Sequence, residues 1–427
     1  MAIIAPFHAV RYAPYLDPAA VLTQPYDKIP PALRADYAAR SPYNLVHLTL
    51  PDDAVAHDHG MDKYAWAAAQ CRQWLRDGIL IQDTMPSFYC YRQSFDLFGS
   101  HYVRNGFIGL CHVEPYERRI IFPHEKTLAK PKADRLALLR AMRMHCELIF
   151  LLYEDDGTAQ RVLDQVMHEA PLSRVRDNFD VENQLWRISL PEHVEALTRA
   201  LAPRQLFIAD GHHRYETSLN YAHEHANDPR AQFTLAMFVN INSSLVILPT
   251  HRSVFGMSNY DASAVRRALS AAFDIAPAGG LDALLTAVNA PPDQLCIGWF
   301  DGRSFWVLHL RHRDAMHAAA PQRSDAWRAL DVAVLHTLVI EGALGISAQT
   351  VEHEAGVGYH RDPREALDAV TSGAAQCAFF LRPTRAAQVC DVARGGEVMP
   401  QKSTDFYPKL LSGLAMYALD LEPHQPA

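Results

Sequence analysis

The chain lacks the short motifs that identify three large classes of enzyme. Its 427 residues contain neither the Gly-x-Gly-x-x-Gly pattern of dinucleotide-binding folds nor the Gly-x-Ser-x-Gly pattern of α/β-hydrolases. Lys402-Ser403-Thr404 has the ending of a Walker phosphate loop, but Pro400-Gln401 stands where that loop needs glycine. These absences argue against a Rossmann site, a hydrolase nucleophile elbow and a true P-loop.

Paired cysteines and long apolar runs are also missing. The seven cysteines are widely spaced and include no Cys-x-x-Cys, which is typical of reduced thiols and not of a disulfide framework or a zinc ribbon. No apolar run reaches membrane-spanning length, and the N-terminus lacks the basic start of a secretory signal. The net charge of −8 argues against general nucleic-acid binding. We therefore expect a cytoplasmic protein that binds neither membranes nor nucleic acid.

The most informative stretch is LFIADGHHRYET, residues 206–217. Its four leading apolar residues predict a short buried strand, Asp210-Gly211 ends that strand, and the apolar spacing beyond it predicts a helix. The first turn of a helix presents N–H groups without intrahelical acceptors and the positive end of the helix dipole. A strand, a glycine turn and a helix therefore predict an anion site.

The side chains of this turn suit chemistry. Arg214 offers a planar fork for phosphate or carboxylate. His212 and His213 can donate hydrogen bonds or move protons. Asp210 can bind a magnesium ion or orient a histidine. Asp-Gly also ends many purely structural strands, but folding alone does not require so many polar groups at one strand end, so we interpret the turn as functional.

Further polar clusters stand at the ends of other predicted elements, where α/β proteins build their sites. They are Tyr26-Asp27, His124-Glu125-Lys126-Thr127, Thr250-His251-Arg252 and Lys402-Ser403-Thr404. Glu125 suits a general base that takes a proton from a substrate hydroxyl, although a charged helix N-terminus is an equally valid interpretation of its cluster. The Thr250 cluster taken alone is more typical of a structural role. Lysine and two hydroxyls at 402–404 can bind phosphate oxygens without a P-loop.

A structural zinc site is not expected. His223 and His225 stand two residues apart, so their side chains diverge by about 200° around a helix. Zinc ligands on one helix are better placed four residues apart.

Composition predicts four segments in an α+β fold. They are an α/β segment at 1–85, a core at 86–256 that carries the turn, an alanine- and proline-rich α/β module at 257–320, and a C-terminal α/β segment at 321–427 that completes the site. Residues 233–241 and 245–249 are predicted to pair as strands. A single helix is predicted over 326–344, and another helix is predicted to end the chain after Lys409.

The chain resembles a bacterial and archaeal family known as domain of unknown function 1015. The matching motifs run almost end to end: Gln24-Pro25-Tyr26-Asp27, Pro42-Tyr43-Asn44, His124-Glu125-Lys126-Thr127, Asp134-Arg135-Leu136, the turn from Ala209 to Glu216, Leu248-Pro249-Thr250-His251-Arg252, and the stretch from Met399 to Lys409. The family name implies no activity.

A second resemblance covers only the turn. Gly211-His212-His213-Arg214 is similar to the Gly-x-x-Arg signature turn of the ParB/sulfiredoxin-like superfamily, which binds nucleotide phosphates there and includes kinases of free serine. The chain departs from ParB itself, because it is acidic and shows no clear DNA-reading helix-turn-helix. The resemblance implies a ParB/sulfiredoxin-like core and a nucleotide site, without a role in chromosome partitioning.

From these features we expect a nucleotide-dependent phosphotransferase that acts on a small hydroxyl metabolite, with free serine as one candidate. ATP or ADP would be the co-substrate and Mg²⁺ the cofactor. The expected catalytic residues are Glu125, Asp210, His212 and His213, with Asp210 as the metal ligand. The expected binding residues are Gly211, Arg214, Asp27, His124, Lys126, Thr127, His251, Arg252, Lys402, Ser403 and Thr404. A non-catalytic nucleotide-binding regulator and a metal-dependent hydrolase remain alternatives, and a homodimer is left open.

Overall fold

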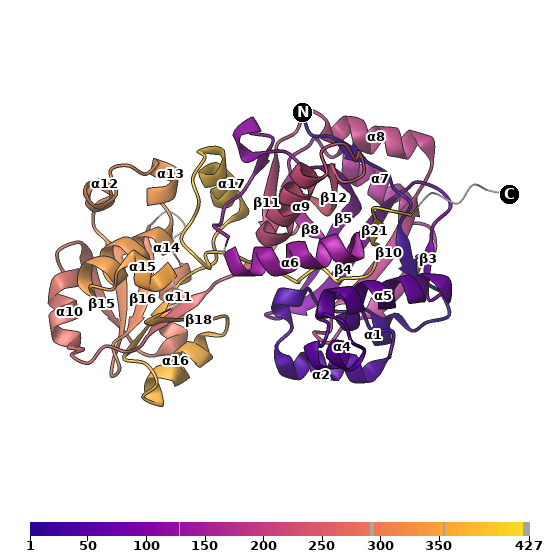
Figure 1. The fold of residues 1–427 in the computed structure, drawn as a ribbon. Coiled ribbons are helices and arrows are strands. Elements are labelled where there is room, and N and C mark those ends of the chain that lie inside the picture. Colours follow the sequence, from indigo (N-terminus) through magenta and orange to yellow (C-terminus); the bar gives the residue numbers. More distant parts are fainter. Residues whose placement is uncertain (128, 291–293, 353–354, 422–427) are drawn as a thin grey trace. The chain divides into compact units, whose positions relative to one another are not determined.

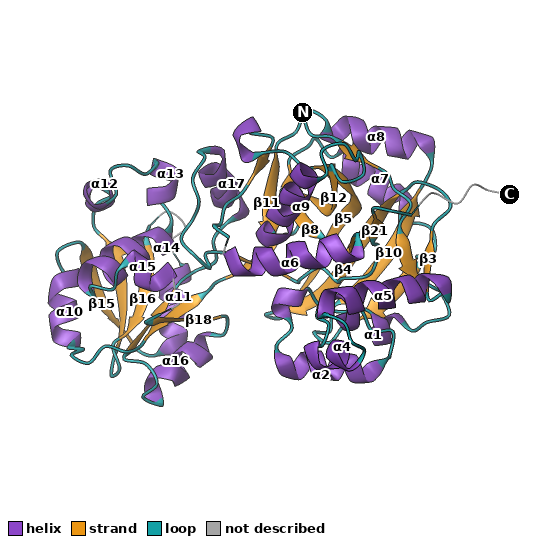
Figure 2. Cartoon of the chain, in the orientation of Figure 1, coloured by secondary structure: helices purple, strands orange, loops and turns teal. Residues whose placement is uncertain are grey.

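The computed structural model describes residues 1–127, 129–290, 294–352 and 355–421, and it is drawn in Figure 1. The chain forms two compact units. The first unit comprises Met1–Pro123, Thr127–Leu245 and Pro408–Ala427, and the second comprises His124–Lys126 and Val246–Tyr407. Each unit mixes helices with largely antiparallel sheet (Figure 2). This arrangement confirms the α+β prediction.

A nine-stranded sheet forms the centre of the first unit. Its order is β6 (Ile121–Phe122), β11 (Leu206–Asp210), β8 (Ile149–Tyr153), β12 (Phe233–Asn240), β5 (Ser100–His112), β4 (Phe88–Leu97), β10 (Glu182–Ile188) and β9 (Ser173–Arg176), with β1 (Ile4–Ala5) also paired to β5. Strand β11 lies parallel to β6 and antiparallel to β8. The strand that precedes the glycine turn is therefore held on both edges.

Amphipathic helices cover this sheet. The unit contains α1 (Pro18–Val21), a 3₁₀ turn η1 (Tyr26–Lys28), α2 (Pro31–Arg40), α3 (Val46–Thr49), α4 (Asp53–Asp58), α5 (Lys63–Arg76), η2 (Tyr116–Arg118), α6 (Ala129–Met142), α7 (Thr158–Val166), α8 (Pro191–Leu201) and α9 (His212–Glu224). Helix α7 illustrates why such helices pack against the sheet. Its buried residues fall on one helical face, and they are Ala159, Val162, Leu163 and Val166. Helices α7, α8 and α9 share one apolar core with the sheet.

A second apolar cluster packs around α5 and α6. Helix α6 lies between α5 and α9 (Figure 1). Two short pairs complete this region: β2 (Val10–Tyr12) with β3 (Leu80–Gln82), and β7 (Met144–His145) with β21 (Tyr417–Ala418). The end of α6 and the end of the chain therefore meet in the same unit as the glycine turn.

The predicted C-terminal helix is wrong. After Lys409 the described chain has no helix and runs largely buried through the first unit. Backbone bonds join Ser412 to Thr23 and Met416 to Val10, and Gly413 has a φ of +89° that a helix does not permit. Hydrogen-bond partners from distant segments outweigh the local helical pattern here.

The predicted pairing of residues 233–241 with 245–249 is also wrong. Strand β12 is bonded on both edges, to β5 and to β8. No edge is left for the next strand, so β13 (Val246–Leu248) pairs with β20 (Asp405–Tyr407) in the second unit.

The second unit is built on a six-stranded sheet. Its order is β15 (Phe273–Ala278), β17 (Phe305–Leu310), β16 (Cys296–Phe300), β19 (Cys377–Phe380), β14 (His251–Val254) and β18 (Val357–His360). Its helices are α10 (Ala262–Leu269), α11 (Leu281–Asn289), α12 (Asp314–Ala319), α13 (Asp325–Arg328), α14 (Asp331–Val334), α15 (Ala348–Glu352), α16 (Pro363–Thr371) and α17 (Ala386–Arg394). Residues 257–320 supply three of the six strands, and the rest come from the chain on either side.

The prediction of one continuous helix over 326–344 is wrong. Helix α13 ends at Arg328, Leu330 is extended, and α14 then leads into a π-helix over Leu335–Ala343. Ser324 caps α13 through the Trp327 N–H. The apolar periodicity is real, but it spans two helical segments of different pitch.

Candidate functional site

The glycine turn, residues 210–214, has the predicted strand–turn–helix form. Strand β11 ends at Asp210, Gly211 takes a φ of +91° in the left-handed region, and α9 begins at His212. A Cβ atom on residue 211 would lie 3.1 Å from Cζ and from Nε of Arg214. Both the backbone conformation and the close approach of the guanidinium explain why glycine occupies this position.

Asp210 joins two cations. Its carboxylate accepts a hydrogen bond from Arg214 Nη2 at 2.9 Å and one from Lys409 Nζ at 3.3 Å. The other guanidinium nitrogen of Arg214 donates to the backbone carbonyl of Leu148. The side chains of Arg214 and Lys409 are only 10% and 8% exposed. The turn is therefore a partly buried group with one more positive than negative charge.

The pKa of Asp210 lies below its usual range. Burial by itself raises that pKa, but the charges of Lys409 and Arg214 outweigh burial, and Lys28 adds to their effect. Asp210 is thus ionised at neutral pH, and it holds both cations in place.

The Tyr26–Lys28 segment lies beside this group. The backbone N–H of Tyr26 donates to Glu147 Oε1 at 2.7 Å, and the Arg135 guanidinium stacks 4.2 Å from the centre of the Tyr26 ring. The charge of Asp27 acts on Arg214, and that of Lys28 acts on Asp210. The structure therefore brings the predicted Asp27 cluster to the glycine turn.

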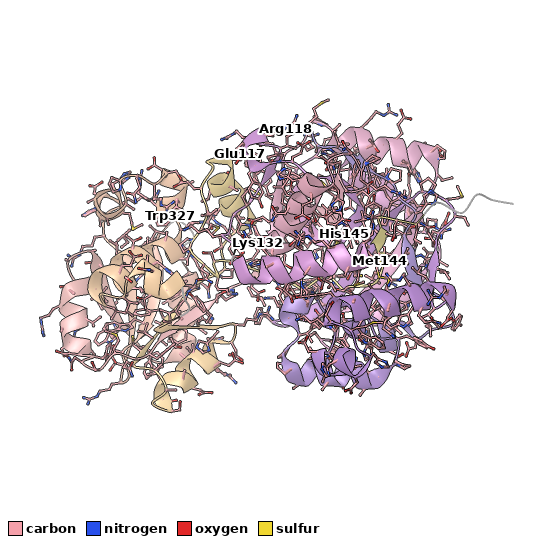
Figure 3. The ribbon with its side chains drawn as sticks, in the orientation of Figure 1. Glu117, Arg118, Lys132, Met144, His145 and Trp327 are labelled. Carbon is pink, nitrogen blue, oxygen red and sulfur yellow. The ribbon has the colours of Figure 1, made fainter. Side chains whose placement is uncertain are left out.

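A small cavity lies beside α9. It has a volume of about 60 Å³. Arg135, Glu147 and Arg214 line it together with Thr49, Thr217, Ser218 and Thr234, and its apolar wall comes from Leu138, Leu139, Met142, Met144, Cys146 and Ile149, with His145 beside them. Met144 and His145 are labelled in Figure 3, beyond the end of α6. The cavity thus contains two guanidinium groups, one carboxylate and several hydroxyls.

Glu147 is the acidic group of this cavity. Its pKa is raised by burial, which the charges of Arg214 and Arg135 partly offset. It accepts from the Tyr26 N–H and from Ser412 Oγ at 3.4 Å. Thr217 Oγ1 is buried and has no hydrogen-bond partner in the structure. A buried carboxylate with a raised pKa near an unsatisfied hydroxyl marks a place where a polar ligand could bind.

The sequence analysis missed Glu147 and Lys409 as site residues. Glu147 carries no local signal, because it stands inside an apolar stretch. Lys409 ends the Met399–Lys409 stretch that resembles the family, and that stretch was the available signal.

Thr127 and α6 contribute a further contact in the first unit. Thr127 Oγ1 and Lys132 Nζ both donate to Glu216 Oε2, each at 2.7 Å. Figure 3 shows Lys132 on α6. Glu216 lies on the first turns of α9, while His212 is buried and His213 half-buried at the start of that helix. The predicted Thr127 thus supports the helix that follows the glycine turn.

In the second unit, three of the predicted clusters come together. His124 Nε2 lies 2.8 Å from Thr404 Oγ1, and the Lys402 N–H donates to Glu125 Oε1 at 3.4 Å. Arg252 Nη2 donates to the carbonyl of Lys402 at 2.9 Å. The clusters at 124–126, 250–252 and 402–404 therefore form one polar group, to which the exposed Lys126 is adjacent in sequence.

Burial dominates the electrostatics of this group. It lowers the pKa of Arg252 to about 10 and, with the charge of Arg252, lowers the pKa of His251 to about 4. His251 Nδ1 accepts from the Leu381 N–H at 3.3 Å, and Ser403 Oγ donates to the carbonyl of Pro400. His251 is therefore neutral at physiological pH, and its part in ligand binding stays a prediction.

The side chains around the glycine turn do not by themselves form a metal site among the described residues. Within the residues that the structure describes, no three side chains of His, Cys, Asp or Glu gather as metal ligands. Asp210 already faces Lys409 and Arg214, and both cations oppose a further positive ion. Magnesium binding by Asp210 stays a prediction. None of the described helices has the length and apolar composition needed to cross a membrane.

We predict that Gly211→Ala weakens nucleotide binding by tenfold or more. A side chain at this φ costs of the order of 1–3 kcal/mol, and its Cβ would press on Arg214 and shift the turn. Calorimetric titration with ATP and ADP measures the effect. Gly99→Ala is the matched control, because Gly99 also has a positive φ and a Cβ there would meet nothing within 4 Å. Equal affinities for wild type and Gly211→Ala would contradict the prediction.

Comparison with known proteins finds no curated protein that matches the chain. Solved structures that are similar to it at low identity include the following three. A free serine kinase in complex with AMP is 13% identical, covers 67% of this chain and 83% of its own, and has a TM-score of 0.35. A conserved hypothetical protein from Pyrococcus furiosus is 12% identical, with coverages of 70% and 92% and a TM-score of 0.35. SbnI with a C-terminal truncation from Staphylococcus aureus is 10% identical, with coverages of 71% and 85% and a TM-score of 0.34.

The sequence itself gives a firmer relationship. A family model matches residues 4–333, which is most of the chain and includes both the glycine turn and the first two predicted clusters. The matched range also contains the Arg252 cluster. The chain belongs to the family described as protein of unknown function DUF1015.

Proposed function

We propose that this protein is a phosphotransferase that moves a phosphoryl group between a nucleotide, ATP or ADP, and a small hydroxyl metabolite. One observation carries the proposal: the glycine turn shares Arg214 with a small cavity that charged and hydroxyl side chains partly line. Phosphoryl transfer depends mainly on positioning and on charge neutralisation. An anion-binding turn next to a small polar cavity supports both requirements.

The phosphates would bind at the start of α9. The N-terminus of a helix attracts anions through its N–H groups and its dipole. Gly211 lets oxygen atoms approach the backbone, and Lys409 with Arg214 adds positive charge that Asp210 only partly neutralises. His212 and His213 stand in the same helical turn and are proposed to donate hydrogen bonds to the phosphates.

The acceptor would bind in the cavity beside α9. A volume of about 60 Å³ holds a ligand of a few heavy atoms and excludes a nucleotide. Two guanidinium groups opposite one carboxylate match a small zwitterion, with its carboxylate toward Arg135 and Arg214 and its ammonium toward Glu147. Free serine has this charge pattern and also a hydroxyl, so it is our first candidate substrate.

Two carboxylates are candidates for the group that takes the hydroxyl proton. Sequence reasoning favours Glu125, and the cavity lining favours Glu147. A general base works best when its pKa approaches the working pH, which burial favours for Glu147. Contacts of Lys402, Ser403, Thr404, His124 and Lys126 with the nucleotide stay predictions.

Phosphorus NMR tests the proposal directly. The full chain is incubated with ATP or ADP, magnesium, and a panel of small hydroxyl compounds that includes L-serine. We expect a new phosphate-ester resonance with at least one acceptor, together with loss of the nucleotide signal that carried the phosphate. Binding without turnover for every acceptor would favour a nucleotide-binding regulator. If the protein purifies with a stoichiometric metal ion and hydrolyses the nucleotide only when that metal is present, a metal-dependent hydrolase would be favoured.

Arg214→Ala is expected to weaken nucleotide binding by about tenfold or more, since a charge-assisted contact contributes roughly 1.5–3 kcal/mol. The substitution removes one cation and releases Asp210 and the Leu148 carbonyl from their shared donor. Calorimetry gives the affinity, and circular dichroism shows whether the fold persists. Arg118→Ala is the control, because Arg118 is exposed and pairs with Glu114 outside the turn. An unchanged affinity would exclude the turn as the phosphate site.

A further inference from the structure

The second unit contains its own strand–loop–helix, at the end of β19. The chain leaves β19 at Phe380, and residues 381–385 lead into α17. Strands β14 and β16 both lie antiparallel to β19, so the start of each meets the end of β19. Strand β17 ends beside the start of β16. Loops from four strands therefore converge at one end of the sheet.

An open pocket of about 220 Å³ lies at these loops. We call it the arginine pocket, and its lining residues are Arg313, Arg382, Arg385, Gln388, Asp391 and the apolar Leu295, Ala326 and Ala329. A smaller cavity shares Arg382 and Gln388 with it and reaches Arg252, Thr384 and Ser403. The two hollows therefore adjoin each other, with Arg382 and Gln388 in the wall of both.

The ion pairs leave this pocket positive. Arg382 Nε bonds Asp331 at 2.6 Å, and Asp391 pairs with Arg394 at 3.3 Å. Arg313 and Arg385 have no carboxylate within ion-pair distance among the residues that the structure describes. The Arg385 side chain reaches Gln388 Oε1 at 3.4 Å. Asp331 and Asp391 are therefore each paired with another arginine, while the charge of Arg385 acts on Asp331 and that of Arg313 acts on Asp325 from beyond ion-pair distance.

Arg252 provides the second, independent observation. It is only 1% exposed and pairs with no described carboxylate. Its guanidinium donates to the backbone carbonyls of Thr250, Gln401 and Lys402, and it lies 5.3 Å from the centre of the Tyr359 ring. Its Nε has no acceptor in the structure. Burying an uncompensated guanidinium is costly, and a bound anion in the adjoining hollow would offset that cost.

We propose that the arginine pocket binds a phosphate group, free or as a small monoester, at a site distinct from the glycine turn. The start of α17 adds its dipole to the charge of Arg313 and Arg385, and Arg252 adds positive charge in the adjoining cavity. The pocket volume accommodates a phosphate with a small substituent. The site lies wholly within the second unit, so an anion bound there acts as a ligand in its own right.

The test measures binding of inorganic phosphate and of O-phosphoserine to the full chain by calorimetry, at fixed ionic strength and with saturating ATP to fill the glycine turn. The pocket variant is Arg313→Gln/Arg385→Gln. The control is Arg303→Gln/Arg364→Gln, which removes the same charge from exposed arginines of the same unit that do not line the pocket. We expect the pocket variant to bind at least tenfold more weakly and the control to match wild type.

The outcomes separate this site from the proposed catalysis. Stronger binding of one probe identifies the free or the esterified form as the ligand. Equal losses of affinity in both variants would show that binding depends only on the overall charge of the unit, which would contradict the site. A wild-type Kd above about 10 mM for both probes would also overturn it. Turnover does not enter the measurement, so a failure of the phosphotransferase proposal leaves this test intact.

Discussion

Replacing Asp210 with asparagine is expected to lower the free energy of unfolding at neutral pH by roughly 3–5 kcal/mol, the range for breaking a buried ion pair. The cause is the pair of cations that the carboxylate holds. Without it, Arg214 and Lys409 remain close together at 10% and 8% exposure with no shared counter-charge. Urea unfolding followed by circular dichroism measures the change.

At acidic pH, the free energies of unfolding of wild type and Asp210→Asn should differ less than at neutral pH. Because the native pKa of Asp210 is depressed, its contribution to stability is complete above the ordinary carboxyl pKa of about 4 and is lost as the pH falls through the lower native value. Glu195→Gln is the control, since the exposed Glu195–Arg199 pair should contribute less than about 1 kcal/mol. If Asp210→Asn lowers the free energy of unfolding by as little as the control does, Asp210 does not stabilise the fold by holding Arg214 and Lys409.

Turnover should fall by roughly 10²–10⁴-fold in Glu147→Gln if Glu147 is the general base. Glutamine keeps the size of the side chain and an oxygen that can accept from Tyr26, but it cannot take a proton. Nucleotide affinity should change little, because the glycine turn keeps its cations. Steady-state kinetics with the acceptor found by phosphorus NMR, together with nucleotide titration, separate the two effects.

Glu125→Gln is the matched comparison for this test. A large loss of kcat in Glu125→Gln with near-normal turnover in Glu147→Gln would assign the base to Glu125 and contradict the prediction. The pH profile adds an independent check. A base must be ionised, so wild-type kcat/KM should fall as the pH drops through the pKa of Glu147, which burial places above the ordinary carboxyl value of about 4.3.

The local features that the sequence predicted correctly all depend on neighbouring residues. Apolar residues followed by Asp210-Gly211 predicted a strand and a turn, and Gly211 has the positive φ that the prediction requires. Short-range patterns suffice where sterics and capping within a few residues decide the conformation.

The errors arose where distant segments compete with local propensity. Residues after Lys409 have apolar spacing that suits a helix, yet they find backbone partners at Thr23 and Val10. The strand after β12 could not pair with it, because β5 and β8 already fill both its edges. No window of the sequence contains this information.

The same division holds for the candidate site. The sequence by itself determined the glycine turn, the groups around it and the list of polar clusters, because each is a run of adjacent residues. Only the tertiary structure decided that Asp210 is held between Arg214 and Lys409, that Tyr26–Lys28 lies beside them, and that Glu147 lines a cavity next to Arg214. The physical reason is that burial and charge compensation depend on side chains far apart in the sequence, such as Lys409 and Asp210 at 199 positions and Ser412 and Glu147 at 265, which only the packed core brings within hydrogen-bond distance.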